Sequence, residues 1–562
     1  MKTLPKADVL LIGIGAAGGI ASYVLTKAGL SVVALEAGPR LSNAEFAKQL
    51  DEVGGYEARN VLGAPKVNHE IPTWRPRASM PVQHLKPPYA ILMANLVGGT
   101  SVHFGAQFWR FHESDFKVRT YTVERYGTKA LPAGSALADW PVSHADMEPY
   151  YDQVEYLIGV SGRGGSNPFE APRSRDYPLP PVRSMGSAEL ATKAMRELGY
   201  HPFPQPAAVL SRRFNGRPAC TFCDFCDGFG CWNNSKSSTL VSAIPAAEKT
   251  GKLEIRPNSR VMRILTDSAG NASGVEYLDS NGQTVTQPAA FVILSTYTYE
   301  NTRLLLVSRT SMFPNGLANN HGQVGKYYMA HYYPSANGIF PGKATNMFSG
   351  TASQGVAMDD LNADNFDHAG LGFIRGAEIG VSNEVRPIGA AANVPPDVPM
   401  WGAAYKQWLR QYGNSIITVS GQLENIPSVH NFLDLDPTKK DPLGMPVVRV
   451  TYDLHENEMR AGNYMLKKAT EILKAMGATK TWYYPPSPLA INSHAYGGTR
   501  TGEDPATSVV DPYLITHEVR NLAVLGASTF PSTTGFNPTC TVEATAWFAA
   551  EHIAKNFHKL AV

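Results

Sequence analysis

Cysteine and charge are the two scarce features of this sequence, and each limits what the protein can be. The chain has 562 residues and only five cysteines. It is long enough to bury a large core, so it needs no disulfide framework. Asp, Glu, Lys and Arg make up 17% of the residues and the formal net charge is +2. This balance excludes the strongly basic surface that nucleic-acid-binding proteins present.

Long apolar runs are also missing. No run of apolar residues approaches the length that crosses a bilayer, so we expect no membrane-spanning helix. Residues 1–8 are too short and too poorly shaped to be a signal peptide. Hydrophobic residues nevertheless reach 43%, which excludes a disordered chain, and 50 glycines with 41 prolines predict many turns and loops. At about 100–200 residues per domain, two to four domains are expected.

The N-terminal region carries a dinucleotide-binding pattern. Residues 8–12 predict a buried strand, and the sequence of residues 13–18 has the spacing GxGxxG. A helix over 19–28 and a second strand over 31–35 follow, and this strand ends at Glu36. The order of strand, glycine turn, helix, strand and acid is typical of a Rossmann-like nucleotide site.

Each residue type in this pattern has a physical role. Gly13 permits the tight turn, Gly15 lets the backbone approach a pyrophosphate, and Gly18 lets the helix pack closely on the strand. Free N–H groups at the helix N-terminus attract phosphate. The carboxylate of Glu36 is expected to accept hydrogen bonds from a ribose. The alternative, a chance glycine-rich turn, does not account for the flanking elements.

Regular elements are expected at several later positions. Strands are predicted over 253–265 and 291–294 from their β-branched content, and a helix begins at Glu300. Residues 456–476 predict an amphipathic helix that Gly477 caps. A C-terminal helix is expected over 541–557.

The remaining chain predicts loops and a further sheet. Residues 40–88 are loop-rich, and residues 130–185 are expected to wrap the surface. Short apolar runs over 320–455 predict a sheet-based domain with long loops. Residues 393–399 form either a mobile lid or a surface loop, of which we favour the surface loop.

A histidine and an asparagine near the C-terminus are candidate catalytic residues. His494 can take the hydroxyl proton of an alcohol, and Asn537 can hold the same oxygen. Residues 521–528 lie between them and predict a strand that ends at small residues, which suits close approach to a cofactor. A lone histidine of this kind is more often structural, so the pair needs further support.

Four segments together resemble one family. They are residues 13–18 with 36–39, residues 98–103, His494 with 497–499, and residues 537–539. This set is similar to the glucose–methanol–choline (GMC) family of FAD oxidoreductases. Within the family it resembles the branch of pyranose oxidases and sugar-acid dehydrogenases, and residues 217–238 resemble the flavoprotein subunits of membrane-bound gluconate 2-dehydrogenases.

The resemblance implies an α/β fold in which a Rossmann-like FAD-binding domain adjoins a sheet-based substrate domain. This is the p-hydroxybenzoate-hydroxylase-like, two-domain architecture. The expected FAD-binding domain is discontinuous and comprises residues 1–135, 236–320 and 486–562. A loop-rich insertion occupies 136–235, and the substrate domain occupies 321–485.

The resemblance also implies the cofactor site. His494 is the expected catalytic base, with Asn537 as its partner. His103 is expected either to bond covalently to the flavin or only to pack on it, and the covalent form is favoured. Residues 295–296 depart from the small residues that the family usually has there, which should not affect the chemistry. The residues expected to bind FAD are Gly13, Gly15, Gly18, Glu36, Gly98, Gly99, Ser101, His103, Val261, Ala527 and Asn537.

Four of the five cysteines are clustered. Cys220, Cys223, Cys226 and Cys231 have the spacing C-x2-C-x2-C-x4-C, which places three thiols on one compact turn as in iron–sulfur sites. Structural zinc and a disulfide are the alternatives. The resemblance favours a [3Fe–4S] over a [4Fe–4S] cluster. Cys540 is expected to be a small buried hydrophobe.

The resulting hypothesis is a dehydrogenase that oxidises a secondary alcohol of a sugar, sugar acid or glycoside. An iron–sulfur cluster would pass its electrons to a cytochrome c subunit and then to quinone. A small exported subunit is expected to bring the chain to the periplasm, peripheral to the inner membrane through its partners, with a cytoplasmic location as the alternative. The substrate is not readable from the sequence.

Two other functions remain open at this point. An oxidase that uses oxygen on a pyranose or glycoside would need no electron relay, and its cysteines would hold a structural metal. A flavin-bearing electron carrier without catalysis is the third reading, which the presence of both His494 and Asn537 disfavours.

Overall fold

The computed structural model describes most of the chain, and the statements below concern that part. It covers residues 2–48, 50–52, 71–85, 93–343, 345, 348, 350–351, 353–382, 386–487 and 493–562. Part of the predicted loop-rich stretch 40–88 lies outside these residues. The described strands form four sheets, mixed with helices, which confirms the predicted α/β class.

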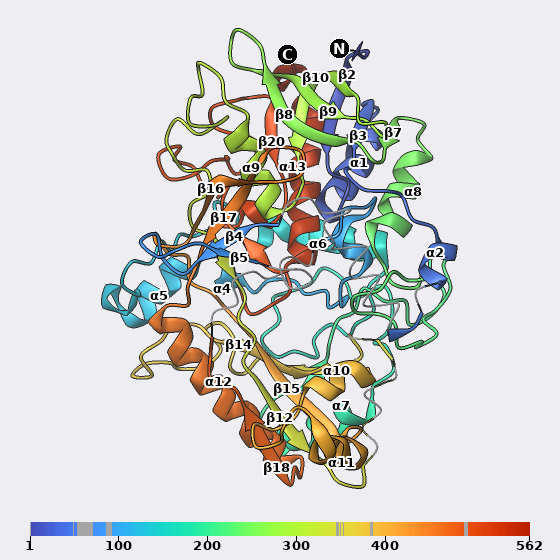
Figure 1. The fold of residues 1–562 in the computed structure, drawn as a ribbon, viewed down its shortest axis with the longest axis vertical. Coiled ribbons are helices and arrows are strands. Elements are labelled where there is room, and N and C mark those ends of the chain that lie inside the picture. Colours follow the sequence, from blue (N-terminus) through green and yellow to red (C-terminus); the bar gives the residue numbers. More distant parts are fainter. Residues whose placement is uncertain are drawn as a thin grey trace.

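The largest sheet has eight strands and lies at the end of the molecule where both termini are found (Figure 1). Its order is β7-β3-β2-β10-β9-β8, and β1 and β20 also pair with β10. The strands are β1 (Lys2–Thr3), β2 (Ala7–Ile12), β3 (Val32–Leu35), β7 (Leu253–Arg256), β8 (Arg260–Thr266), β9 (Ala272–Leu278), β10 (Thr284–Leu294) and β20 (Leu522–Val524). Neighbours among β7, β3, β2, β10 and β20 run parallel, so their carboxyl ends meet at one edge, where α/β sheets bind ligands.

The parallel strands are apolar because both of their faces are covered. Residues 9–12 of β2 and 291–294 of β10 are buried. Helices α1 (Ala16–Lys27), α8 (Ala243–Glu248) and α13 (Thr539–Leu560) pack beside this sheet, and α1 contacts both other helices. The packing of α1 fixes the position of its N-terminus at the edge of the sheet.

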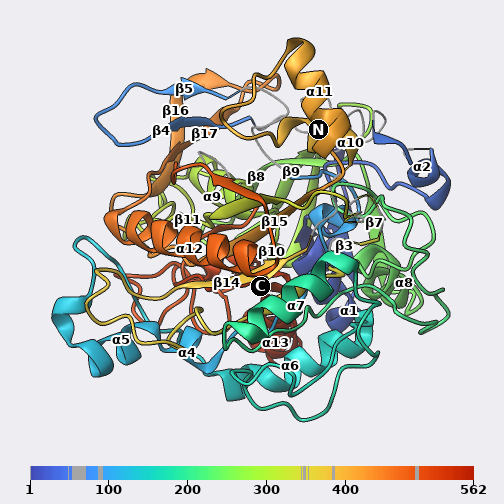
Figure 2. The same ribbon diagram turned by 90° about the horizontal axis from the view of Figure 1, so that it is seen from below.

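A six-stranded antiparallel sheet lies at the opposite end of the molecule (Figures 1 and 2). Its order is β18-β12-β15-β14-β13-β6. The strands are β6 (Phe203–Pro204), β12 (Ser335–Ile339), β13 (Val356–Met358), β14 (Ala377–Val381), β15 (Ile416–Leu423) and β18 (Lys480–Tyr483). Helices α12 (Glu456–Ala475) and α7 (Gly186–Glu197) pack against it.

Two smaller sheets link these ends. The four-stranded sheet has the order β16-β17-β4-β5, and its strands are β16 (Phe432–Lys440), β17 (Pro446–Thr451), β4 (Thr73–Arg75) and β5 (Gln83–His84). The two-stranded sheet pairs β11 (Met329–Ala330) with β19 (Ala495–Tyr496). β19 follows directly after His494 and so fixes where that residue lies.

The other helices are mostly short. The α-helices are α2 (Asn43–Ala47), α4 (Glu113–Phe116), α5 (Val118–Tyr126), α6 (His144–Ile158), α9 (Thr298–Val307), α10 (Pro387–Ala392) and α11 (Gly402–Tyr412). The 3-10 turns are η1 (Gly99–Val102), η2 (Thr128–Ala130), η3 (Thr239–Val241) and η4 (Ala527–Thr529).

Most predicted elements are confirmed, with ends shifted by a few residues. The strands over 8–12 and 31–35 are β2 and β3, and the strand over 291–294 is the end of the longer β10. The helix predicted from Glu300 is α9, and the helices over 456–476 and 541–557 are α12 and α13. The helix predicted over 19–28 is α1, which begins earlier, directly after the glycine turn.

The prediction that residues 130–185 wrap the surface needs a correction, because part of this segment is buried. They contain the 15-residue helix α6, whose N-cap Ser143 forms a capping box with Asp146. One face of α6 is buried, and this helix packs on α13. That buried face includes Met147, Tyr151, Val154 and Ile158.

The single strand predicted over 253–265 is also wrong. It is two strands, β7 and β8, with Pro257 and Asn258 between them, and Asn258 has φ +52°. Residues 393–399 form a loop between α10 and α11, as favoured. Its Val394 is buried in a cluster with Trp408.

The predicted domain boundaries stay a prediction, but the sheets show how the segments combine. β4 and β5 come from the predicted 1–135 segment and pair with each other, and β4 also pairs with β17 of 321–485. β6 comes from 136–235 and pairs with β13.

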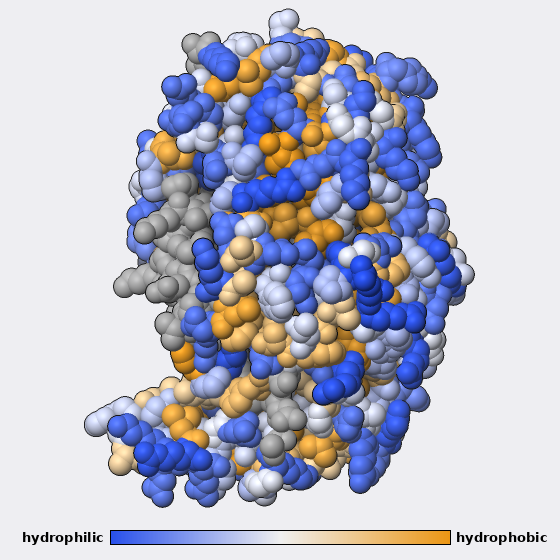
Figure 3. Space-filling view, turned by 90° about the vertical axis from the view of Figure 1, so that its right-hand side faces the viewer, coloured by the Kyte–Doolittle hydropathy of each residue, from blue (hydrophilic) through white to orange (hydrophobic). Residues whose placement is uncertain are grey.

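The surface agrees with the low charge of the sequence. Seen from the side, apolar side chains form patches among predominantly hydrophilic ones (Figure 3). None of the described helices has the length and apolar character needed to cross a membrane.

Candidate active site

The first glycine motif forms the turn between β2 and α1. Gly13 has φ +82°, and its N–H donates to the carbonyl of Leu35 at 2.8 Å. A Cβ at Gly18 would lie 2.3 Å from the carbonyl oxygen of Gly13, so only glycine lets α1 pack this closely. A Cβ at Gly15 would meet only the Cα of Gly99, at 3.6 Å. Gly15 therefore leaves its backbone open to a ligand.

A second glycine turn packs on the first. The N–H of Gly98 donates to the carbonyl of Ile14 at 2.9 Å, and Gly98 and Gly99 have φ +95° and +59°. A Cβ at Gly99 would lie 2.7 Å from the Cα of Gly15. The Ser101 hydroxyl donates to the carbonyl of Gly98 at 2.7 Å and holds η1 in place. The two turns thus meet backbone to backbone, which only residues without side chains allow.

Residues 295–296, which differ from the small residues expected at this position, have a structural role. The Ser295 hydroxyl donates to the carbonyl of Gly13 at 2.7 Å and lies 3.1 Å from the carbonyl oxygen of Ile12. Its oxygen would lie 2.8 Å from a Cβ at Gly18. Ser295 therefore supports the first glycine turn from behind.

Glu36 is positioned at the end of β3 by backbone groups. Its two carboxyl oxygens accept from Gly38 N–H at 3.0 Å and Ile14 N–H at 3.3 Å. Burial raises the pKa of Glu36 to about 7, while these N–H groups and Arg260 act to lower it. A carboxyl group held at this place can accept hydrogen bonds from ribose hydroxyls.

One cavity of about 880 Å³ joins the glycine turns and Glu36 to His494 and Asn537. This volume lies in the range of cofactor and ligand pockets, roughly 300–1,000 Å³. Gly18 and Gly98 do not line it and pack behind it instead. The other predicted residues that line it are Gly13, Gly15, Gly99, Ser101, His103, Val261 and Ala527.

The residues present fit a dinucleotide such as FAD. The N-cap of α1 is Gly15, which has no side chain to satisfy the first free N–H groups of the helix. Those groups and the positive end of the helix dipole suit a pyrophosphate. Gly13 and Gly15 line the cavity with backbone alone. The glycine turn and the N-terminus of α1 together form a dinucleotide cradle, in which a ligand can approach the main chain closely.

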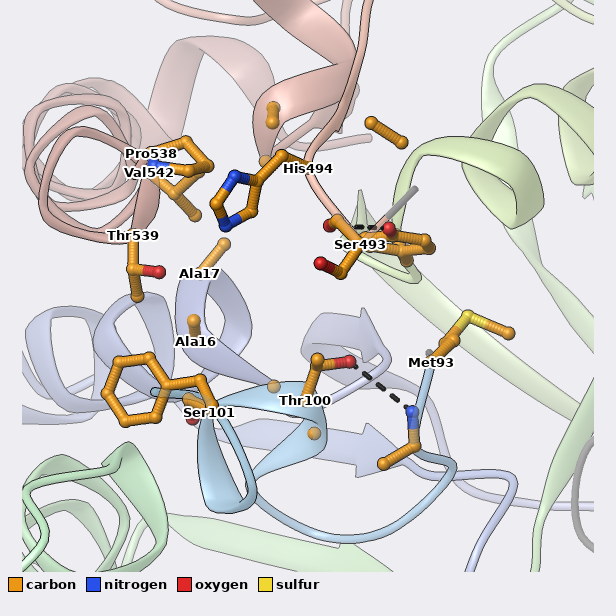
Figure 4. A pocket seen from close by; sticks show the side chains of 18 of the residues that line it. Ala16, Ala17, Met93, Thr100, Ser101, Ser493, His494, Pro538, Thr539 and Val542 are labelled. Carbon is orange, nitrogen blue, oxygen red and sulfur yellow. Dashed lines mark hydrogen bonds between the residues drawn. The ribbon is translucent and has the colours of Figure 1, made fainter. Parts of the chain in front are cut away.

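His494 and Asn537 lie together at the other part of the cavity. The Asn537 Nδ2 atom is 3.3 Å from His494 Nε2, although the two residues come from different elements. His494 precedes β19, and Asn537 lies just before α13. The imidazole projects into the pocket beside Pro538 and Val542, with η1 across from it (Figure 4).

Trp109 fixes the orientation of the Asn537 amide. The indole Nε1–H, which can only donate, lies 2.9 Å from Asn537 Oδ1. The Gln422 amide Nε2 is a second donor, at 3.4 Å from the same oxygen. With Oδ1 held by two donors, the NH₂ group of Asn537 faces His494.

This orientation defines the protonation state of His494. Because Asn537 Nδ2 donates, the facing Nε2 of neutral His494 is the acceptor, and Nδ1 carries the proton. Nδ1 has two neighbours that can accept that proton, Tyr333 OH at 2.8 Å and His331 Nδ1 at 3.0 Å. The Tyr496 hydroxyl lies 3.1 Å from His331 Nε2. The unprotonated Nε2 of His494 therefore faces the Asn537 amide, and both residues line the cavity.

Burial keeps this imidazole neutral. Desolvation lowers the pKa of His494 to about 4. It lowers the pKa of His331 even further, and the neighbouring His494 adds to that effect. At neutral pH the Nε2 atom is thus a free base, ready to accept a proton.

Sequence reasoning missed the side chains that position the pair. Trp109, Gln422, His331 and Tyr333 come from segments far apart in the chain. No motif or spacing connects them to His494, so no local signal could have found them. Their common property, contact with His494 or with Asn537, exists only in the folded chain.

The predicted metal site at the cysteines is not supported. No group of three or more His, Cys, Asp or Glu among the described residues is arranged to hold a metal ion. Cys226 Sγ lies 3.3 Å from the Thr351 hydroxyl, and the Cys231 thiol donates to Asn233 Oδ1 at 3.1 Å. Phe222 and Asp224, between the cysteines, have left-handed backbone conformations, with φ +54° and +70°.

The loop that carries the cysteines is instead organised by Lys236. The buried ammonium donates to the carbonyls of Phe104, Cys226 and Phe229 at 3.1, 2.6 and 2.7 Å. The N–H of Gly228 donates to the carbonyl of His103 at 2.7 Å. The loop therefore lies against the cavity wall near His103. Cys540 is fully buried, as predicted.

A dinucleotide cradle joined to a neutral imidazole base defines a flavin-dependent oxidoreductase. Comparison with known families agrees, because models of the GMC oxidoreductase N- and C-terminal regions match residues 136–333 and 427–546. The chain belongs to the GMC oxidoreductase family, and the predicted resemblance is confirmed.

Characterised relatives match almost the whole chain. The gluconate 2-dehydrogenase flavoprotein of Pantoea cypripedii is 33% identical over 99% of this chain and 95% of its own length. The 2-methyl-1,2-propanediol dehydrogenase of Mycolicibacterium austroafricanum is 30% identical, covering 98% and 96%. The fructose dehydrogenase large subunit of Gluconobacter japonicus is 28% identical, covering 98% of both chains.

Solved structures share the fold at low identity. Pyridoxine 4-oxidase from Mesorbium loti has a TM-score of 0.62 and 16% identity, over 97% of this chain and 99% of its own. Formate oxidase from Aspergillus oryzae also has a TM-score of 0.62, with 15% identity over 100% of this chain and 99% of its own. These likenesses confirm the fold.

Proposed function

We propose that the protein is an FAD-dependent dehydrogenase that oxidises a secondary alcohol of a sugar, sugar acid or glycoside. The observation that carries the proposal is the unprotonated Nε2 of His494, which faces the cavity beside the Asn537 NH₂ group. A base and a hydrogen-bond donor that line the same cavity can bind one substrate hydroxyl group together. The base accepts its proton, and the donor binds its oxygen.

The reaction assigns distinct tasks to the two side chains. The substrate hydroxyl donates to His494 Nε2, which takes the proton as the alcohol becomes a carbonyl. Asn537 Nδ2 donates to the same oxygen and fixes its position. Bound FAD supplies the acceptor for the hydride. His331 and Tyr333 hold the far side of the imidazole.

The relatives support an alcohol substrate. Those named above are dehydrogenases of gluconate, fructose and 2-methyl-1,2-propanediol, and all three are aligned with nearly the whole chain. Their substrates differ in charge and size, so the names alone do not select a substrate for this chain.

The test is anaerobic bleaching of the flavin absorbance in the purified holoenzyme, with sugars, aldonates and polyols as reductants. His494→Ala should keep its FAD but bleach about 10²–10⁴ times more slowly. Unchanged bleaching in this variant would remove His494 from the reaction. Glu471→Gln, on the exposed side of α12, is the matched control and should behave as the parent.

The electron acceptor is tested with the same preparation. We expect reduction of an artificial dye to be much faster than oxygen consumption. The reverse result would make the enzyme an oxidase. No metal-binding group is found among the described residues, and the [3Fe–4S] cluster stays a prediction. Iron and acid-labile sulfide in the purified protein would establish it.

The covalent flavin link through His103 also stays a prediction. His103 lies at the end of η1 and lines the cavity, as a residue that contacts the cofactor should. Acid precipitation provides the test, because a covalent flavin stays with the pellet. In His103→Ala the flavin should then be released to the supernatant.

We also propose that the chain acts with partner subunits. The names of two relatives, a flavoprotein and a large subunit, support an assembly. The expected partners are a small exported subunit and a cytochrome c, with the complex in the periplasm on the inner membrane. Co-purification from the native host tests this, and isolation of the active chain alone from the cytoplasm would contradict it.

A further inference from the structure

The wall of the cavity formed by the six-stranded sheet carries two buried acceptors. Glu378 on β14 and Gln205, just after β6, both line the cavity. A Cβ at Gly380 would lie 2.7 Å from Glu378 Oε1 and 3.1 Å from Gln205 Nε2, so both side chains lie over the same glycine. Glycine at this position makes room for them side by side.

This pair lies close to the catalytic residues. Glu378 pairs with Gln422 across β14 and β15, so both side chains project from the same face of the sheet. Gln422 in turn contacts Asn537 Oδ1 at 3.4 Å. Alternate residues such as Ile379 face the opposite, apolar side towards the core under α12. The strand pattern therefore places Glu378 on the cavity side and near the position of the reacting alcohol.

The side chains of Gln205 and Glu378 hydrogen-bond to each other, but one oxygen of each stays without a partner in the described part of the chain. Glu378 Oε1 and Gln205 Oε1 have no hydrogen-bond partner there, although the residues are 8% and 3% exposed. Buried polar atoms without partners are rare and costly. Two carbonyl-type oxygens facing a cavity call for a ligand that donates hydrogen bonds, and a polyol does so with each hydroxyl.

Charge near this wall disfavours an anionic ligand. Burial raises the pKa of Glu378 well above its usual range, and the nearby Asp359 adds to the effect. Among the described residues that line the cavity, Arg260 is the only lysine or arginine. It lies beside Glu36 and Glu300 at the nucleotide part. A substrate carboxylate would therefore be buried without a cationic partner, which is costly.

We propose that Glu378 and Gln205 form a hydroxyl-binding subsite that selects a neutral polyhydroxylated substrate over a sugar acid. The proposal rests on the dehydrogenase function above and narrows its substrate class. Hydroxyl groups next to the reacting carbon donate to the two Oε1 atoms, and this anchors the substrate under His494 Nε2. A carboxylate at the same place has no hydroxyl proton to donate to these oxygens, and no lysine or arginine among the described residues of this wall neutralises its charge.

The first experiment measures kcat/KM with a dye acceptor for D-sorbitol, D-fructose and D-glucose, against D-gluconate and cyclohexanol. We expect at least one neutral polyol or sugar to exceed D-gluconate by tenfold or more. A D-gluconate value equal to or above all the neutral compounds would overturn the proposal.

The second experiment uses Glu378→Leu and Gln205→Leu, each of which replaces the polar side chain by an apolar one of similar size and removes its acceptor oxygen. Leaving a substrate hydroxyl unpaired should raise KM for the preferred polyol roughly tenfold, with a smaller change in kcat. Cyclohexanol has no second hydroxyl, so its kcat/KM should stay the same. Equal losses for both substrates would show that the residues are only structural. Flavin content and the unfolding midpoint identify any variant that misfolds, and Glu471→Gln serves as the control.

A binding measurement separates this proposal from the dehydrogenase function. Calorimetry with the His494→Ala holoenzyme follows D-sorbitol, D-fructose and D-gluconate without turnover. Tighter binding of a neutral compound, lost in the His494→Ala/Glu378→Leu double variant, supports the subsite even if no compound bleaches the flavin. Binding of D-gluconate alone, or of none of them, would overturn it.

Discussion

The two parts of the cavity are built in opposite ways. The nucleotide part is made of backbone from one short stretch, in which β2, the turn at Gly13 and the end of β3 at Glu36 are near neighbours in sequence. The catalytic part is made of side chains from distant segments, including Trp109, Gln422 and His494. A backbone site depends on where side chains are absent, whereas a side-chain site depends on the packing of several sheets. Mutations should therefore affect the two parts differently.

Gly18→Ala should have the largest effect, on the nucleotide part alone. Its Cβ would lie 2.3 Å from the carbonyl oxygen of Gly13, which forces α1 off the turn. We expect protein without FAD, or no soluble protein, as measured by the flavin absorbance of the purified chain. The control is Gly186→Ala on α7, where an added Cβ would meet no atom within 4 Å. Normal FAD content in the Gly18 variant would contradict the account of close packing.

Arg375→Met should destabilise the support of the catalytic part. The buried guanidinium contacts Asp115, and it donates to Glu424 at 2.8 Å and Asp364 at 3.0 Å. Asp115 also accepts from the Thr534 hydroxyl, in the loop that leads to Asn537. Removing one partner of a buried charge network costs about 3–5 kcal/mol.

Urea unfolding of the holoenzyme measures this loss. Arg460→Met removes an exposed ion pair with Glu456 on α12 and should cost less than about 1 kcal/mol. Similar losses in the two arginine variants would show that the buried network does not stabilise this region.

Trp109→Phe tests the orientation of the Asn537 amide with a smaller effect. Phenylalanine keeps the stacking on Phe536 but loses the Nε1–H donor to Oδ1. We expect the rate of flavin reduction to fall roughly tenfold, since one hydrogen bond contributes about 1 kcal/mol, while FAD content stays normal. In an Asn537→Ala background the same change should have little further effect, because Trp109 acts through that amide. Additive losses would assign Trp109 another role.

The effect of pH should be the smallest of these effects, and it should differ between the two parts of the cavity. A neutral His494 is required, and its pKa of about 4 means that the base stays free as the pH falls from 8 to 5. The rate of flavin reduction should then be lost as the pH falls through about 4. Glu36, with a pKa of about 7, loses its charge on acidification near neutrality. FAD affinity of the apoprotein should weaken there, while the FAD-saturated rate does not. A rate that already declines below pH 7 would indicate an ordinary histidine pKa.

The same contrast explains what could be predicted. The parallel strands, the glycine turn and α12 follow from local patterns, because each apolar face or glycine has a reason within a few residues. Helix α6 was also readable, since Ser143 and Asp146 form a capping box before an apolar stripe, but the many prolines and glycines around it favoured a loop. The cluster predicted from the cysteine spacing stays a prediction, because no metal-binding group is found among the described residues.

The sequence by itself determined the nucleotide cradle, the pairing of His494 with Asn537 and the family. Those features are encoded in motifs whose residues act through the backbone or at fixed positions after a strand. Only the tertiary structure decided which way the Asn537 amide faces, which nitrogen of His494 carries the proton, and that Glu378 and Gln205 share one wall. These properties depend on donors and acceptors from distant segments of the chain, and on the burial that their meeting creates, so no stretch of sequence contains them.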